Sequence, residues 1–273
     1  MALMHLNFNS RCLSGSTDVN IILPDLTQDT APKEFYVRGK KYPVLWLLHG
    51  SFGDYTDWVR KTNIEVYAAE KELIVVMPSA HNTDYANWAG FGTGYLMYDY
   101  LTEELMPLVY AWFPASDKRE DNFIAGLSMG GRGAIMYAYA HPEKFAAMYS
   151  MSCVPQDMRL AAAKANDAEG LVAERTRNRL ENAGGLAAYL VSPQNTWDRT
   201  AEIAGRTDMP KLYFACGTAD FMYQDFLKFR AYAQKLGLNA QFTEAEGYAH
   251  EWRVWEKCIQ DALGEFLPDQ KQV

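Results

Sequence analysis

The chain has 273 residues, of which 49% are hydrophobic, enough for a substantial core in one α/β domain or in two small ones. The formal net charge is -8, and acidic and basic residues are interspersed along the chain. This pattern argues against a nucleic-acid partner and against a membrane surface, because both attract clusters of positive charge. A small or neutral substrate fits the composition better.

The N-terminus and the cysteines bear on the cellular compartment. Residues 1–10 contain no basic region, no unbroken apolar run and no small-residue cleavage site, and no later apolar run approaches membrane-spanning length. We therefore expect a cytoplasmic protein. The four cysteines are far apart and show no C-x-x-C spacing, so the sequence predicts neither a disulfide framework nor a metal site.

The first part of the chain predicts the edge and the interior of a sheet. Segments 3–13 and 17–23 read as two strands, joined by an S-G-S turn into an antiparallel edge pair. A polar surface loop is expected at 24–42. Fully apolar runs at 44–48 and 73–77 have the length of strands that are covered on both faces in a parallel sheet.

Two helices and an aromatic loop are expected around the second of these runs. A short helix is predicted at 63–71, between the two apolar strands. The segment 82–91 is rich in aromatic residues and reads as a loop. A longer helix is predicted at 95–112, where apolar residues recur at helical spacing, and Pro107 is expected to kink it.

One motif in the middle of the chain predicts a serine nucleophile. The stretch N-F-I-A-G-L-S-M-G-G-R, residues 122–132, contains Ser128 in a G-x-S-x-G arrangement. A serine on a tight strand-to-helix corner has a strained backbone, and the chain can pass only where its neighbours lack side chains, here Gly126 and Gly130. An apolar run at 123–125 and an Ala-rich helix after Met129 fit this corner. The alternative is an ordinary glycine-rich turn.

The second half alternates strands and helices after one interruption. Strands are expected at 145–153, 212–216 and 241–245, with helices at about 221–236 and after Trp252. This alternation predicts an α/β fold whose mostly parallel central sheet is flanked by helices. The intervening segment 154–209 has no strand-like run and reads as a helical lid within a single domain, 1–273. Its alternative is a peripheral excursion without a role in catalysis.

The nucleophile needs a base, and chain order selects one. In α/β-hydrolases the acid and then the histidine follow the serine, each after a later strand. Of the five histidines, only His250 lies beyond all the later strands. Asp220 follows the strand 212–216 directly and is the favoured acid, although it could also cap the next helix; Asp225 lies further on, inside that helix.

Ester hydrolysis also requires N–H donors for an oxyanion. The backbone N–H of Met129, at the start of the helix after the nucleophile, is one candidate. The second is expected from the H-G-S-F-G loop after the strand 44–48, with Ser51 favoured over Phe52. Trp88, Tyr85 and Phe221 are candidate substrate-binding residues, although each could instead be an ordinary packing residue.

With these motifs in place, the chain resembles the esterase D-like branch of the α/β-hydrolases, most closely bacterial tributyrin esterases and related feruloyl or cinnamoyl esterases. The shared stretches begin with L-L-H-G-x-x-G-x-x-x-x-W, T-N-x-E and L-I-V-V-M-P. They continue with F-I-A-G-L-S-M-G-G, C-G-x-x-D-F and H-E-W-x-x-W. These stretches extend over residues 47–255, nearly the whole chain.

The resemblance implies a serine carboxylesterase for short-chain acyl esters, with acetyl, butyryl or feruloyl groups as candidates, no cofactor and often a homo-oligomer. It also implies Ser128, Asp220 and His250 as the triad, with Ser51 and Met129 as oxyanion donors. The same triad would serve a thioesterase of the S-formylglutathione hydrolase type or an acyltransferase. A non-catalytic binding protein of this fold is the remaining alternative.

Overall fold

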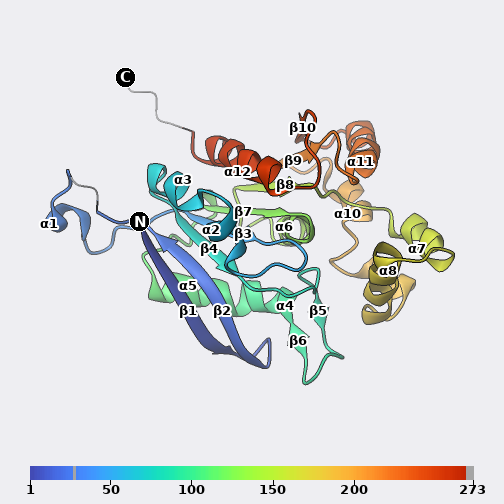
Figure 1. The fold of residues 1–273 in the computed structure, drawn as a ribbon, viewed down its shortest axis with the longest axis horizontal. Helices are drawn as coiled ribbons and strands as arrows, with labels where there is room; N and C mark the ends of the chain where they lie inside the picture. Colours follow the sequence, from blue (N-terminus) through green and yellow to red (C-terminus); the bar gives the residue numbers. More distant parts are fainter. Residues whose placement is uncertain (27–28, 269–273) are drawn as a thin grey trace.

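A twisted sheet runs through the protein, whose computed structural model describes residues 1–26 and 29–268 (Figure 1). In that part of the chain the sheet has eight strands in the order β1-β2-β4-β3-β7-β8-β9-β10. The strands from β4 to β10 in this order are parallel, whereas β2 pairs antiparallel with β4 and β1 antiparallel with β2. Their bounds are β1 Ala2–Ser10, β2 Gly15–Leu23, β3 Val44–Leu48, β4 Ile74–Pro78, β7 Asn122–Leu127, β8 Ala147–Met151, β9 Lys211–Gly217 and β10 Ala240–Ala245.

Helices cover both faces of the sheet, as the alternating pattern predicts. Side chains point alternately to the two faces of a strand, so along β3 Trp46 packs into one core while Leu45 and Leu47 pack into the other. On one face lie α2 (Asp57–Lys61), α3 (Ile64–Glu70) and α12 (Trp252–Phe266). On the other lie α5 (Met106–Trp112), α6 (Met129–Ala140) and α11 (Tyr223–Leu236). Double coverage explains why the central strands read as unbroken apolar runs.

The predicted helix 95–112 is confirmed from Met97 onward, but it begins two residues late and changes type along its length. Tyr95–Leu96 is a short strand, β6, paired with β5 (Asn87–Trp88). After one turn of helix (α4, Met97–Asp99), Tyr100–Leu105 forms a wide π-helical segment in which the N–H of Met106 bonds to Leu101 O. The next residue, Pro107, is near the start of α5 and has no N–H to donate to the helix, so the π-helical segment ends where the regular hydrogen-bond pattern would lack a donor.

Smaller differences occur at short elements. The first hairpin turn is at 11–14, and Gly15 already belongs to β2. The expected loop 24–42 contains a single helical turn, α1 (Pro32–Phe35), and a 3₁₀ turn at Arg119–Asp121 precedes β7. The helix α2 was not predicted, because five residues are too few for a periodic pattern. None of the helices among the described residues is long and apolar enough to cross a membrane.

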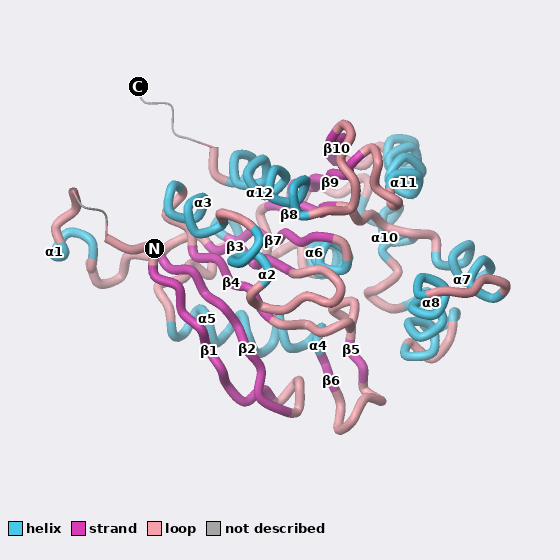
Figure 2. Tube along the Cα trace, in the orientation of Figure 1, coloured by secondary structure: helices cyan, strands magenta, loops and turns pink. Residues whose placement is uncertain are grey.

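The regular elements of the segment 154–209 are all helices, as its composition predicts. It contains α7 (Met158–Asn166), α8 (Leu171–Asn182), α9 (Leu186–Val191) and α10 (Thr196–Ile203). Helix α10 packs on the body of the protein, where Trp197 stacks on Tyr232 with ring centroids 4.3 Å apart. Helices α7 and α8 stand at the opposite end of the molecule from α1 (Figure 2). They lie near the carboxyl ends of the parallel strands, where sites form in such sheets.

Candidate active site

Ser128 sits on a sharp corner between β7 and α6. Its backbone has φ 52° and ψ -115°, a conformation that residues other than glycine rarely adopt. Its N–H donates to Met151 O at 2.8 Å. The neighbouring glycines explain how the corner closes. A Cβ on Gly126 would lie 2.4 Å from the carbonyl of Gly130, and one on Gly130 would lie 2.4 Å from Leu48 O. The G-x-S-x-G spacing is therefore a packing requirement of this turn.

Replacing Gly126 with alanine should lower the free energy of unfolding by about 1–3 kcal/mol or prevent folding, because the added methyl meets backbone rather than a movable side chain. Gly264 is the matched control, since it lies in α12 with nothing within 4 Å of a new Cβ. Gly264→Ala should raise stability by roughly 0.5–1 kcal/mol through helix propensity. Urea unfolding of both variants tests this; equal stabilities would contradict the packing argument.

Two side chains join Ser128 in a hydrogen-bonded line. His250 Nε2 lies 3.0 Å from Ser128 Oγ, and His250 Nδ1 lies 3.0 and 2.9 Å from the two carboxylate oxygens of Asp220. A carboxylate only accepts, so Nδ1 carries the proton and Nε2 is left as an acceptor for the serine hydroxyl. This is the arrangement that a general base requires. Asp225, the other candidate acid, instead accepts a hydrogen bond from Gln156 at 2.7 Å.

The carboxyl of Asp220 is held in its ionised form. Burial alone would raise its pKa, but hydrogen bonds from His250, the Met222 N–H and the Ser152 hydroxyl outweigh burial and lower the pKa below 3.8. The Met222 N–H donates to Asp220 Oδ1 at 2.8 Å, and Ser152 in turn accepts from the indole N–H of Trp255 at 2.9 Å. The acid is thus fixed by groups from several elements.

The candidate oxyanion donors lie on two segments that touch. Met129 is the first residue of α6, where the N–H groups have no partner within the helix. A Cβ on Gly130 would also lie 2.6 Å from His49 O, so the loop after β3 passes directly against the start of α6. In this loop the N–H of Phe52 donates to Asn82 Oδ1 at 2.9 Å. That bond occupies the alternative donor and favours Ser51.

His49 braces this loop. The N–H of Ala80 donates to His49 Nε2 at 2.9 Å, so Nδ1 carries the proton and donates to Gly50 O at 2.6 Å. Burial lowers the pKa of the imidazole, which favours the neutral form that these two bonds need.

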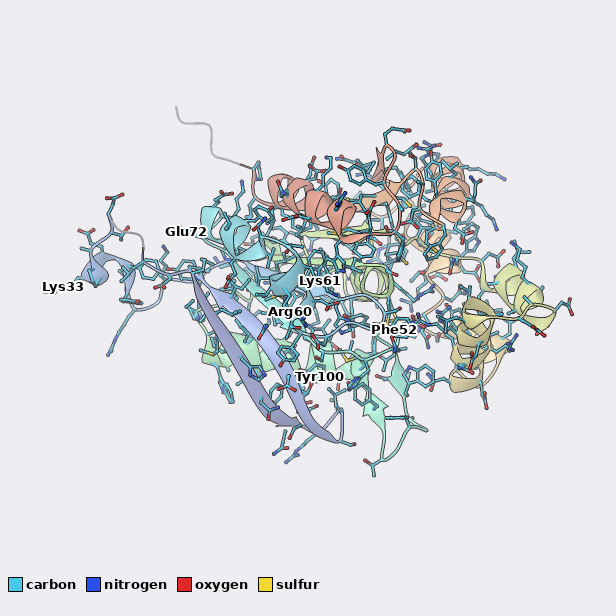
Figure 3. All side chains as sticks on the ribbon, in the orientation of Figure 1. Lys33, Phe52, Arg60, Lys61, Glu72 and Tyr100 are labelled. Carbon is cyan, nitrogen blue, oxygen red and sulfur yellow. The ribbon has the colours of Figure 1, made fainter. Side chains whose placement is uncertain are left out.

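The three aromatic candidates lie in different surroundings. Tyr85 is fully buried, and its hydroxyl donates to His49 O at 3.2 Å, so it is a packing residue and does not line the site. Phe221 is 70% exposed and packs on the His250 ring at 4.5 Å. Trp88 lines a hollow next to the one that contains Ser128, together with the exposed Phe52. Figure 3 shows Phe52 between the body of the sheet and the helices of 154–209.

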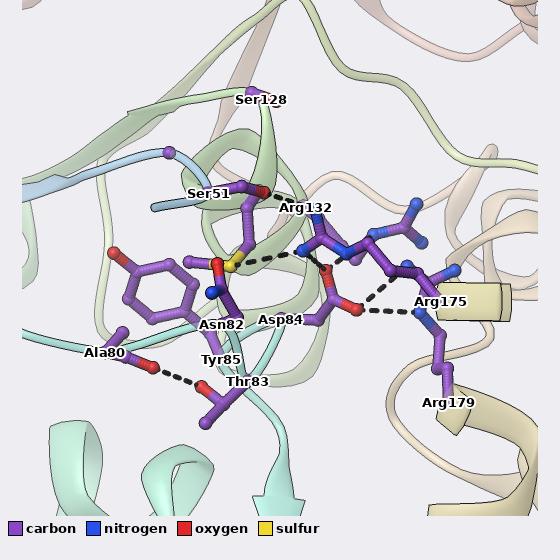
Figure 4. Close-up of polar contacts among 12 residues, drawn as sticks. Ser51, Ala80, Asn82, Thr83, Asp84, Tyr85, Ser128, Arg132, Arg175 and Arg179 are labelled. Carbon is purple, nitrogen blue, oxygen red and sulfur yellow. Dashed lines mark hydrogen bonds and ion pairs between the residues drawn. The ribbon is translucent and has the colours of Figure 1, made fainter. Parts of the chain in front are cut away.

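A cavity of about 130 Å³ opens at Ser128 and is lined by charged residues that sequence reasoning missed. Three guanidiniums, from Arg132 on α6 and from Arg175 and Arg179 on α8, surround the carboxylate of Asp84 (Figure 4). Burial alone would raise the pKa of Asp84, but the three positive charges outweigh burial and lower it. Helix α8 is therefore tied by ion pairs to the loop 82–91.

Comparisons with known proteins show the family of this chain. The Esterase family model matches residues 12–266. The chain belongs to the Esterase family. An acetyl esterase of Caldicellulosiruptor saccharolyticus is 28% identical over 96% of this chain and 97% of its own. Among solved structures, the fluorophosphonate-binding serine hydrolase F of Staphylococcus aureus is 32% identical, with a TM-score of 0.80 over 98% of this chain and 99% of its own.

A second solved structure of similar identity carries a different activity in its name. The S-formylglutathione hydrolase of Staphylococcus aureus is 32% identical, with a TM-score of 0.76, over 97% of this chain and 98% of its own. The resemblance predicted from the motifs is confirmed: this esterase has the α/β-hydrolase fold and is a serine carboxylester hydrolase. Its substrates are small-molecule esters.

Some residues at the site of this esterase could have been found from the sequence, and others could not. Ser152 directly follows β8, the strand beside the elbow strand, so its place at the same sheet edge was available from the strand pattern. Asp84 and Arg175 had no comparable signal, because one lies in an irregular loop with φ 54° and the other on a helix outside the sheet.

Proposed function

We propose that Ser128, His250 and Asp220 form the catalytic triad of this esterase and that it hydrolyses esters of short acyl groups. The observation that carries the proposal is the hydrogen-bonded line from Ser128 Oγ through the imidazole to the buried Asp220. In this mechanism the hydroxyl attacks the ester carbonyl while Nε2 accepts its proton. The same nitrogen then protonates the leaving alcohol, and water releases the acid from the acyl-enzyme.

The N–H groups of Ser51 and Met129 are the proposed donors to the oxyanion. The helix dipole of α6 favours negative charge at its N-terminus, and the close contact between the two segments keeps the donors in place before the reaction. Such fixed donors stabilise the tetrahedral intermediate more than the flat ester.

The size of the cavity supports a short acyl group. Its volume of about 130 Å³ is well below the roughly 300–1,000 Å³ of sites that enclose drug-sized molecules. The name of the acetyl esterase relative points the same way. In this proposal Phe221 and Trp88 contact the substrate, and the segment 154–209 acts as a lid over the site. A cytoplasmic location and a homo-oligomer remain predictions from the sequence.

A second candidate is hydrolysis of a thioester, since one relative at 32% identity is an S-formylglutathione hydrolase. The same nucleophile, base and oxyanion donors would serve a thioester, and an acyltransferase would differ only in its acceptor. Hydrolysis of S-formylglutathione at a kcat/KM above that for 4-nitrophenyl acetate would favour this candidate. Product analysis with added alcohols would detect acyl transfer.

Covalent labelling tests the nucleophile and an acyl series tests the pocket. A fluorophosphonate should label Ser128, as located by peptide mass spectrometry, and should abolish hydrolysis in proportion to labelling. The kcat/KM for 4-nitrophenyl acetate and butyrate should exceed that for the octanoate by on the order of tenfold or more, because the longer chain must leave the cavity. Labelling at another serine, or an octanoate that is the best substrate, would contradict the proposal.

A further inference from the structure

The cavity beside Ser128 carries more positive than negative charge. Four charged side chains line it, namely Arg132, Arg175, Arg179 and Asp84, so the formal sum is +2. They are largely withdrawn from water: the side chains of Asp84 and Arg179 are 7% and 9% exposed, and those of Arg132 and Arg175 are 15% and 26% exposed. Charges in such surroundings interact more strongly than they would in bulk water.

Asp84 compensates one guanidinium well and the other two poorly. Arg179 donates to Asp84 Oδ2 from Nε and Nη2, at 2.9 and 2.8 Å. The other oxygen, Oδ1, lies 3.8 Å from Arg132 Nε and 3.7 Å from Arg175 Nη2, beyond ordinary hydrogen-bond length. The one negative charge of Asp84 therefore balances only part of the positive charge of the three guanidiniums.

The remaining contacts of Arg132 and Arg175 are with neutral groups. Arg132 donates to Gln156 Oε1 at 2.8 Å, and the nearby carboxylate of Asp225 bonds to that glutamine instead of to a guanidinium. Arg175 donates to Ser51 Oγ at 2.6 Å and contacts Met129 Sδ at 3.8 Å (Figure 4). Arg175 is therefore a partly desolvated cation next to the proposed oxyanion donors, and its carboxylate partner among the described residues, Asp84, lies 3.7 Å away and is hydrogen-bonded to Arg179 instead.

In the proposed mechanism, the acyl group lies on the cavity side of Ser128. His250 must reach the leaving oxygen to protonate it, so the alcohol lies near the imidazole. Among the described residues, Ser128 and Met129 line the cavity and His250 does not, although Phe221, which packs on the His250 ring, also lines it. An acyl chain attached to Ser128 would therefore extend into the cavity and toward the arginines.

We propose that this cavity binds acyl groups that end in a carboxylate, so that the enzyme hydrolyses half-esters of short dicarboxylic acids, with Arg175 as the anion-binding residue. The inference rests on the proposed role of Ser128. A planar guanidinium can donate two parallel hydrogen bonds to a carboxylate. In the complex, these two hydrogen bonds would replace the one that Arg175 donates to Ser51 Oγ. The reaction is ordinary hydrolysis: water adds to the acyl carbon, the ester C–O bond breaks, and the alcohol leaves with a proton.

The test compares two methyl esters of nearly the same shape. Monomethyl succinate has a terminal carboxylate, and methyl 4-oxopentanoate has a neutral methyl ketone in its place. Wild-type enzyme should show the higher kcat/KM with monomethyl succinate, measured by methanol release. Arg175→Gln should lower the ratio of the two kcat/KM values by on the order of 10- to 100-fold, as expected for one charge-assisted interaction. Arg175→Lys should restore part of it.

Arg159→Gln is the matched control. Arg159 is half exposed on α7 and pairs with Asp198, so this variant removes one positive charge from the same helical segment away from the cavity. Its ratio should equal that of wild type. Salt provides a measurement that needs no variant: raising ionic strength should lower the wild-type kcat/KM for monomethyl succinate and leave that for methyl 4-oxopentanoate unchanged.

The remaining outcomes separate this inference from the function on which it rests. An unchanged ratio in Arg175→Gln, or hydrolysis of methyl 4-oxopentanoate without hydrolysis of monomethyl succinate, would overturn the inference and leave the esterase mechanism intact. A preference for O-acetylglycolate over ethyl acetate, with none between the two methyl esters, would place the anion on the alcohol and also overturn it. Turnover without Ser128 would remove the basis of both.

Discussion

Ser128→Ala is expected to lower kcat for 4-nitrophenyl butyrate by on the order of 10⁶, the size of effect seen when a serine nucleophile is removed from an enzyme of this mechanism. The variant retains the oxyanion donors and the cavity but has no atom with which to form an acyl-enzyme. Residual hydrolysis should therefore remain above the uncatalysed rate. Steady-state kinetics, with active-site titration of the wild type, measures the difference.

The fold of Ser128→Ala should persist, since the substitution removes one oxygen and keeps the backbone. The Ser128 side chain bonds only to His250 among the described residues, so little packing is lost. Thermal unfolding checks this point. Ser16→Ala, which removes a hydroxyl bonded to Asn9 on the exposed hairpin, is the control and should keep wild-type activity. A Ser128→Ala protein that turns over within tenfold of wild type would refute the assignment.

The second large effect is expected for Asp220→Asn, which should lower kcat by on the order of 10⁴, as the equivalent change does in a serine protease. An amide can donate to Nδ1 as well as accept from it, so the imidazole can take the tautomer with its proton on Nε2. That tautomer cannot accept a proton from Ser128. KM should change little, because Asp220 does not contact the acyl cavity.

Asp225→Asn is the matched control for the acid. Its carboxylate bonds to Gln156 and lies on the next helix, so kcat should stay within about tenfold of wild type. If Asp225→Asn lowered kcat more than Asp220→Asn did, the assignment of the acid would be reversed.

The pKa of Asp220 also predicts a pH dependence of stability. Its pKa in the folded state is lower than its ordinary value of 3.8, so the ionised carboxylate stabilises the fold. This contribution is fully present above the ordinary pKa and is lost as pH falls through the lowered one. The difference in unfolding free energy between wild type and Asp220→Asn should therefore shrink only below about pH 4. A difference that grows with acid would contradict this sign.

Chain order and strand pattern were enough to predict which side chains meet at the elbow. Each residue follows a parallel strand, and the carboxyl ends of parallel strands lie at one edge of a sheet. Side chains 122 positions apart, Ser128 and His250, are therefore adjacent without any contact having been known. Strands such as β3 could be predicted from their unbroken apolar sequence, because helices cover both faces of the sheet.

The parts that were not predictable depend on packing between elements. The helical character of 154–209 follows from its composition, but nothing in the pattern of α8 indicates that Arg175 reaches Ser51. The burial of Tyr85 could not be read from a loop that also contains the half-buried Trp88. The π-helical segment before Pro107 was not predictable either, because the apolar spacing indicates a helix but does not distinguish π-helical from α-helical turns.

The line from Ser128 to Asp220 has a consequence for the nascent chain. The proposed base lies 122 residues after the proposed nucleophile, and the carboxylate of Asp220 accepts a hydrogen bond from Ser152, which in turn bonds to Trp255 on α12. At a synthesis rate of about 5–20 residues per second, the elbow leaves the ribosome several seconds before its partners. An unfinished chain would therefore lack the proposed base and acid, and we expect hydrolytic activity to begin only when α12 docks.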